Sequence, residues 1–189
     1  MGVDLATLEV NLVQARWFHK GRINKVVQII IHTAECPLVV GAEHGVANYF
    51  KTEDRQASAH LTVAPTGIVQ SVRLEDTAWA AKNANSNGVH IEHAGYAAFT
   101  AAQWQEPLAQ QELELSAQLC AALLKHFGLP AVQVQYKNPD VLHGDPAVIQ
   151  PGIGFHDLVP LHGSHTDPGA GFPRAAYISR VGQILAAVQ

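Results

Sequence analysis

The stretch KVVQIIIHTAE, residues 25–35, decides how the fold is interpreted. It is an almost unbroken run of β-branched and other apolar residues, which is typical of a strand buried on both faces of a sheet. The run ends at His32 and Thr33, where the chain must leave the sheet. This stretch therefore predicts a buried strand with an imidazole where it opens to solvent.

The segments that follow predict helices and strands in alternation. Residues 41–56 are helical in composition. Residues 57–72 contain two short strand patterns around Pro65-Thr66-Gly67, which is a hairpin signature. GVHIEHAGY, residues 88–96, predicts a further strand that carries a carboxylate in its middle.

The C-terminal half is expected to form two helices separated by a long loop. A helix is predicted over residues 100–127, because Gly128 and Pro130 follow in the order that ends a helix. Its apolar stripe consists of Leu108, Leu115, Leu119, Ala122, Leu123 and Phe127. Residues 136–173 show little periodicity, and loops of this length are uncommon unless functional. Residues 174–189 predict the last helix.

The composition indicates one globular α/β domain. The chain has 189 residues, of which 48% are hydrophobic and 15% charged. A net charge of −4 argues against electrostatically driven binding to nucleic acid or to an anionic membrane. The sequence has no run of about 20 apolar residues and no export signal at its start, so we expect synthesis in the cytoplasm.

The eleven histidines raise the expectation of a metal site. A catalytic zinc ion usually takes three ligands from His and carboxylates. Each candidate alone is also explained as a core or surface residue, and DPG alone is a turn. The two cysteines, Cys36 and Cys120, are far apart and support neither a disulfide framework nor a zinc finger. The candidate ligands are His32, His60, His93, His143, His156, His162, His165 and Asp167.

Several ordered motifs resemble one enzyme family. IIIHTAE, SAHLTVAPTGIVQSV, VHIEHAG, GFHDL and SHTDPGAGF are similar, in the same order, to the zinc-dependent N-acetylmuramoyl-L-alanine amidases of type 2. This family shares its fold with peptidoglycan recognition proteins and several phage endolysins. The resemblance covers roughly residues 25–185. It implies a mixed sheet flanked by helices, with a zinc cleft at one sheet end, an amidase domain over 25–189 and an N-terminal extension over 1–24.

The resemblance also implies the metal ligands. His32 matches the first zinc ligand, His156 in GFHDL the second, and Asp167 in the DPG turn the third. His143 lies too far upstream of that turn to be the second ligand. The implied cofactor is one Zn²⁺ ion.

The implied reaction is hydrolysis of the amide between the lactyl group of N-acetylmuramic acid and L-alanine of the stem peptide. Glu92 resembles the family's general base for a zinc-activated water. His165 stands where the family usually carries Lys, and we expect it to stabilise the oxyanion. Because His loses its charge near neutrality, activity should decline at a lower alkaline pH than in Lys-bearing relatives.

Four further residues are expected near the substrate. Trp79 matches a segment that lines the family's substrate groove, and Asn85 and Asn87 in the same segment could bond glycan or peptide. His60 matches a position close to the cleft, where it contacts substrate, supports a ligand or simply packs. His93 is expected to be structural, since strand alternation points it away from Glu92.

The expected partner is bacterial peptidoglycan, and the role that fits best is phage lysis after release to the cell wall. A host autolysin or recycling amidase is an alternative with the same chemistry. A non-catalytic peptidoglycan-binding module is a second alternative, which the presence of three candidate ligands and a Glu disfavours. A stem-peptide endopeptidase is a third, but its His-rich motif pattern is not found.

Overall fold

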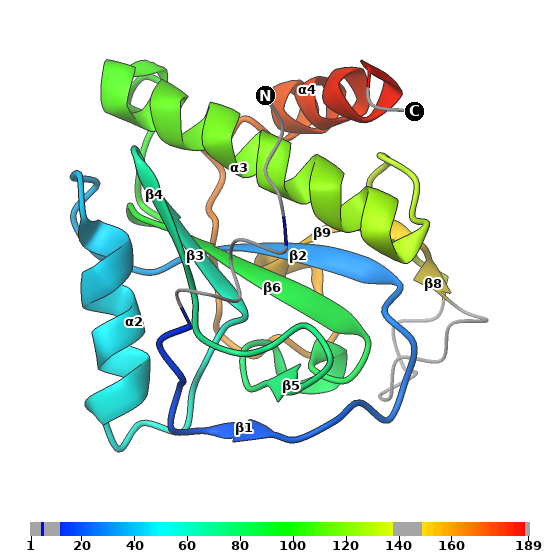
Figure 1. Ribbon diagram of the computed structural model, residues 1–189. Helices are drawn as coiled ribbons and strands as arrows, with labels where there is room; N and C mark the ends of the chain where they lie inside the picture. Colours follow the sequence, from blue (N-terminus) through cyan, green and yellow to red (C-terminus); the bar gives the residue numbers. More distant parts are fainter. Residues whose placement is uncertain (1–4, 6–11, 138–148, 188–189) are drawn as a thin grey trace.

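The computed structural model describes Leu5, residues 12–137 and residues 149–187. Its centre is a five-stranded sheet with the order β4-β3-β6-β2-β9 (Figure 1). The β3–β4 pair is antiparallel and the other neighbours are parallel, so the sheet is mixed, as expected. The strands are β2 (Gln28–Thr33), β3 (Leu61–Ala64), β4 (Gly67–Gln70), β6 (Gly88–His93) and β9 (Gly152–Phe155).

Strand β2 confirms the prediction made from its sequence. All six of its residues are buried, and it has a parallel neighbour on each side. The register pairs His32 with Glu92 on β6 and Ile31 with Phe155, the last residue of β9. The carboxyl ends of three parallel strands therefore meet at one edge of the sheet, which is where open α/β sheets place their ligands.

Three helices flank the sheet. Helix α2 (Ala42–Thr52) packs against the β3–β4 hairpin, whereas α3 (Pro107–Phe127) crosses the sheet and carries α4 (Arg174–Ala187) on its outer side (Figure 1). Among the residues that the structure describes, no helix has the length and apolar character needed to span a membrane. Short elements complete the fold: β1 (Phe18–His19), β5 (Thr77–Ala78), β7 (Gln135–Tyr136), β8 (Ile149–Gln150), η2 (Lys82–Ala84), η3 (Gln103–Gln105) and η4 (His156–Leu158).

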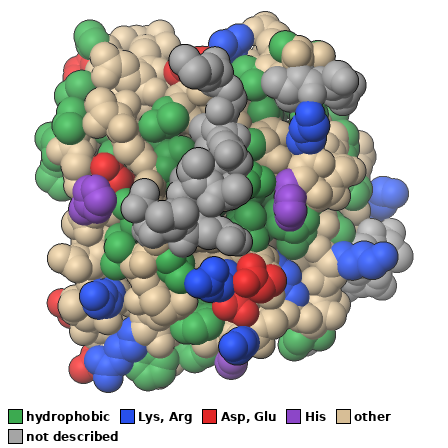
Figure 2. All heavy atoms as spheres, viewed as in Figure 1, with side chains coloured by type: hydrophobic (Ala, Val, Ile, Leu, Met, Phe, Trp, Pro, Cys, Tyr) green, Lys and Arg blue, Asp and Glu red, His purple; other side chains and the backbone are tan. Residues whose placement is uncertain are grey.

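The two faces of the sheet differ in chemistry because side chains alternate along each strand. Ile29, Ile31 and Ile91 point toward α3 and join the main apolar core, which also includes residues of α4. His32 and Glu92 occupy the opposite face, which the long helices leave uncovered. On the side of the molecule seen in Figure 2, Lys and Arg side chains are dispersed among acidic and apolar ones.

Three expectations for the C-terminal half need correction. The helix expected from residue 100 begins at Pro107, which occupies its first turn, where a missing N–H costs nothing. Leu108, assigned to its apolar stripe, is 39% exposed. The loop expected over 136–173 contains β9, whose sequence GIGF is too short and too rich in glycine to resemble a strand. His143 lies outside the described residues.

The N-terminal segment packs on the domain from residue 12 onward. The backbone N–H groups of Val13 and Ala15 donate to the carbonyls of Gln70 and Ser71, and β1 pairs with β5. The boundary at residue 25 stays a prediction.

A buried carboxyl on α3 fixes the chain just after β6. Glu112 is fully buried, and its Oε1 accepts the Ala94 N–H at 2.7 Å. Its Oε2 has no hydrogen-bond partner within the described residues. Burial raises the pKa of Glu112 from 4.5 to about 9, so the folded protein holds the neutral acid near pH 7.

This raised pKa predicts a pH-dependent loss of stability that Glu112→Gln should relieve. Stability from the neutral carboxyl is complete below the unfolded pKa of 4.5 and is lost as the pH rises toward 9. At about pH 7.5, the free energy of unfolding of Glu112→Gln, measured with urea, should therefore exceed that of wild type by on the order of 3 kcal/mol. At about pH 4 the two proteins should be equally stable. The exposed Glu53→Gln serves as control, and equal behaviour of both variants would contradict the prediction.

Candidate metal centre and substrate cavity

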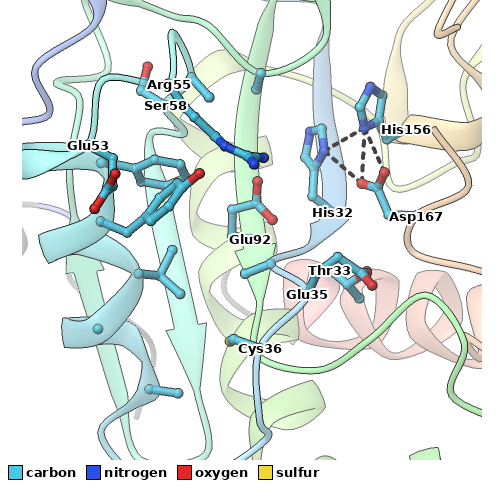
Figure 3. Close-up of a pocket in the computed structure, with 18 of the residues that line it drawn as sticks. His32, Thr33, Glu35, Cys36, Glu53, Arg55, Ser58, Glu92, His156 and Asp167 are labelled. Carbon is cyan, nitrogen blue, oxygen red and sulfur yellow. Dashed lines mark hydrogen bonds and ion pairs between the residues drawn. The ribbon is translucent and has the colours of Figure 1, made fainter. Parts of the chain in front are cut away.

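Three side chains from distant parts of the chain converge at the edge of the sheet. His32 lies near the end of β2, His156 directly follows β9, and Asp167 comes from the loop before α4 (Figure 3). His32 Nδ1 lies 3.1 Å from both His156 Nδ1 and Asp167 Oδ2. His156 Nδ1 lies 3.0 Å from each Asp167 oxygen. The three side chains predicted as ligands thus form one cluster.

The cluster fits a zinc ion by its donor set and spacing. Tetrahedral zinc with bonds of about 2.0–2.2 Å has ligand atoms roughly 3.3 Å apart, close to the distances observed here. Burial lowers the pKa of His32, which keeps a nitrogen lone pair available. Burial alone would raise the pKa of Asp167, but hydrogen bonds with His156 and His32 hold it well below its usual range. Two imidazoles and one carboxylate leave a fourth position for water or substrate.

The loop that carries Asp167 is tied to the segment after β9. The Asp157 N–H donates to the Asp167 carbonyl at 2.8 Å. Arg174 at the start of α4 forms an ion pair with Asp157 and donates to the Gly169 carbonyl at 3.2 Å. These contacts hold the second and third members of the cluster in one local unit.

Glu92 lies beside the cluster and faces the cavity. It is paired with His32 across the β2–β6 ladder, so both side chains project from the same face (Figure 3). Its Oε2 is buried and has no partner within the described residues. Burial, together with the negative charges of Asp167 and Glu35, raises the pKa of Glu92 well above its usual value. A carboxyl beside the cluster with an unpaired oxygen can accept and return a proton.

His165 lies at the mouth of the same site. Its side chain is 53% exposed, and its ring lies 4.3 Å from the His156 ring. Its Nδ1 is 3.7 Å from Asp167 Oδ1, too far for a hydrogen bond. Partial burial and the neighbouring His156 lower the pKa of His165. The side chain is therefore free to point toward a substrate oxygen.

A cavity of about 960 Å³ extends from the cluster toward α2. This volume lies at the upper end of the range for small-ligand sites. Its wall includes Val46 and Tyr49 of α2, and Arg55 beyond the helix end. Figure 3 shows the Arg55 side chain reaching into the cavity on the side of Glu92. The cavity thus combines an apolar wall along α2 with charged side chains near the cluster.

Of the four residues predicted to contact substrate, Trp79 lines this cavity. It stands on a second aromatic ring, Trp17, with centroids 5.8 Å apart and planes 30° apart. This packing supports Trp79 from behind and leaves it partly exposed at the cavity wall.

The other three residues predicted to contact substrate lie outside the cavity wall. His60 is fully buried beside Arg22, and burial with that positive charge lowers its pKa to about 3. Asn87 is fully buried, and its Oδ1 accepts from the Gln28 amide at 3.0 Å. Asn85 Oδ1 accepts the N–H groups of two alanines in its own loop and is not in the cavity wall. Their polar atoms bond other parts of the protein, and for His60 this agrees with the expectation that it packs or supports a ligand.

The structure also adds residues that the sequence reasoning missed. Glu35 and Arg55 line the cavity, although no functional role was predicted for either residue. His90, two residues before Glu92, lies on the same strand face and contacts His32. The period-two alternation of β6 could have placed His90 there. His93, expected to be structural, packs against Phe172 and Tyr177 on the other face, as that alternation predicts.

The sequence of this chain matches a family model described as N-acetylmuramoyl-L-alanine amidase over residues 22–170. The chain belongs to this family. N-acetylmuramoyl-L-alanine amidase A of Achromobacter lyticus is 28% identical to this amidase over 162 residues, 84% of each chain. The enzyme class inferred from the motifs, a peptidoglycan amidase, is therefore confirmed.

Solved structures share the fold of this amidase. Hydrolase AmiA of Staphylococcus aureus, solved with its ligand, superposes with a TM-score of 0.69 at 15% identity, over 94% of this chain and 83% of that one. An AmpD derivative gives 0.59 at 16% identity, over 90% and 93%. A mutant endolysin from Bacillus subtilis gives 0.57 at 17% identity, over 90% and 97%. These likenesses confirm the fold class.

The loop that presents Asp167 depends on a glycine, which predicts a large cost for one substitution. Gly169 has φ 86°, and a Cβ there would lie 1.9 Å from the Ala97 carbonyl oxygen. Gly163 has φ 75°, but a Cβ there would meet no atom within 4 Å. Gly163→Ala should cost about 1 kcal/mol for the left-handed backbone, and Gly169→Ala roughly 2–4 kcal/mol, because the loop must also move. Urea unfolding of both variants tests this, and equal losses would refute it.

Proposed function

We propose that this amidase cuts the bond between the lactyl carbonyl of N-acetylmuramic acid and L-alanine with one Zn²⁺ ion held by His32, His156 and Asp167. The observation that carries the proposal is the convergence of these three buried side chains beside Glu92 in one cavity. When bound, zinc would polarise the scissile carbonyl and lower the pKa of water at the open position.

Glu92 is assigned as the group that moves the proton. It takes a proton from the attacking water and returns it to the departing amine of L-alanine. The C–N bond breaks, a C–O bond forms, and the products are a lactyl carboxylic acid and a peptide with a free N-terminus. The Glu92 carboxyl holds the proton between the two transfers.

His165 and Trp79 are assigned to the substrate. His165, half-exposed next to the cluster, would donate a hydrogen bond to the oxyanion that develops during attack. The Trp79 ring offers an apolar face at the cavity wall, against which a sugar or peptide group can pack.

Digestion of purified cell walls tests the reaction. Wild type should release intact stem peptides that begin with free L-alanine, together with glycan that carries free lactyl carboxylates, as seen by mass spectrometry. Metal analysis should find one zinc per chain, and chelation should abolish release until zinc is added back. Cleavage within the peptide, or binding to the wall without products, would refute the proposal.

Substitutions then test the assigned roles. Glu92→Gln should keep its zinc and lose about 10²–10⁴-fold in kcat, because it can no longer carry the proton. His165→Ala should lose on the order of 10²-fold in kcat, and His165→Lys should restore activity and extend it to higher pH. Near-full activity of Glu92→Gln, or a His165→Lys pH–rate profile equal to that of wild type, would contradict the assignments.

The biological role proposed for this activity is lysis of a bacterial host by a phage, with the enzyme acting at the cell wall after release. Its fold-level likeness to the Bacillus subtilis endolysin supports this role. Expression in bacteria should reduce culture turbidity only after the membrane is permeabilised. Lysis without permeabilisation, or activity restricted to soluble wall fragments, would favour a host autolysin or a recycling amidase.

A further inference from the structure

A second buried histidine contacts the first member of the metal cluster from behind. His90 lies on β6, and its fully buried side chain shares the strand face of Glu92. Its Nδ1 is 3.0 Å from His32 Nε2, and the two ring centroids are 5.2 Å apart. The other nitrogen of His32, Nδ1, faces His156 and Asp167. The His32 ring is therefore held on both sides.

The contact between His90 and His32 Nε2 bears on which nitrogen of His32 can bind a metal. A neutral imidazole carries one proton, and a metal can bind only the nitrogen without it. For His32 Nδ1 to be a ligand, the proton must reside on Nε2 and donate to an acceptor. The structure provides His90 Nδ1 at that place. A hydrogen bond to the distal nitrogen of a ligand His fixes both its tautomer and its ring orientation.

We propose that His90 is a positioning residue that accepts the Nε2 proton of His32 and thereby keeps His32 Nδ1 bare and directed at the zinc ion. This inference rests on the proposed zinc site, and it assigns to His90 no contact with substrate or with the metal.

The His90 ring is itself held in place. It stacks on His60 with centroids 5.5 Å apart and planes 14° apart. The His90 backbone N–H donates to His60 Nδ1 at 3.1 Å. Space for the ring depends on Gly88, because a Cβ there would lie 2.8 Å from Ile30 Cδ1 and 3.2 Å from His90 Nε2. Rotation of the ring away from His32 would break this packing.

The support continues to the N-terminal segment through His60. His60 Nδ1 accepts the His90 backbone N–H, and His60 Nε2 lies 3.2 Å from the Asp76 carbonyl oxygen. Arg22 Nη2 lies 2.7 Å from the same nitrogen. The Arg22 guanidinium also donates to the carbonyls of Leu74 at 2.6 Å and Gly88 at 3.0 Å. A layer of polar groups bonded to the backbone thus supports the His32 ring.

Two substitutions at His90 separate the hydrogen bond from simple packing. His90→Asn keeps an acceptor oxygen at the branch from Cγ where Nδ1 stands, whereas His90→Leu fills the space without an acceptor. Loss of the contact to a ligand His typically weakens metal binding about 10–100-fold. We expect that loss for His90→Leu and a change of less than about threefold for His90→Asn.

The control is His93→Leu, which removes a buried imidazole from the same strand. His93 packs on the opposite face and bonds the His32 backbone carbonyl at 3.1 Å, not its ring. His93→Leu should lower the thermal midpoint of the metal-free protein as much as His90→Leu does. It should leave zinc affinity within about threefold of wild type, because the His32 ring keeps its acceptor.

The measurements are zinc affinity, by competition with a chromophoric chelator, and the ¹⁵N chemical shifts of the His32 ring. Wild type, His90→Asn and His93→Leu should show a protonated Nε2 on His32, and His90→Leu a mixture of tautomers. Equal zinc affinities for His90→Leu and wild type, or equal losses for His90→Leu and His93→Leu, would overturn the positioning role. A wild-type protein that binds no zinc would instead refute the proposed function.

Discussion

Parallel pairing on both sides of one buried strand is the constraint on which the rest of the structure depends. Strand β2 bonds to β6 and to β9, so its end has a fixed position relative to the ends of both neighbours. His32, Glu92 and His156 all lie at or just beyond these ends. The site therefore inherits its geometry from backbone hydrogen bonds, which do not depend on any flexible side chain.

The same pairing gives the two faces of the sheet different roles. One face is apolar and buries its side chains against α3 and α4. The other carries buried histidines, whose hydrogen bonds compensate for the loss of water. His32 contacts His90, the His90 backbone bonds His60, and His60 lies against the Asp76 carbonyl oxygen. The core provides stability, and the polar face provides a rigid support for chemistry.

Clear apolar patterns made most strands of the sheet predictable from sequence. The absence of such a pattern explains why one strand was not predicted. Strand β2 and the β3–β4 hairpin follow from their residue patterns, and the cluster follows from a resemblance carried by short motifs. Strand β9 was missed because it has two glycines in four residues and pairs with β2 from more than 100 residues away. The choice between the roles left open for His60 could not be made from sequence, because sequence order does not reveal that the ring turns inward, toward Arg22. Motifs identify residue types, but only tertiary packing determines which of them face solvent.

The cavity wall has two separate origins, and this separation affects how the enzyme can change. The reactive end is built from the ends of paired strands, where one shift would disturb the whole sheet. The far end is built from α2. Helix α2 packs mainly against the β3–β4 hairpin at the edge of the sheet. Variation in α2 can therefore alter which peptidoglycan fragments fit the cavity while the reactive end stays intact. The architecture allows substrate selectivity to evolve independently of catalysis.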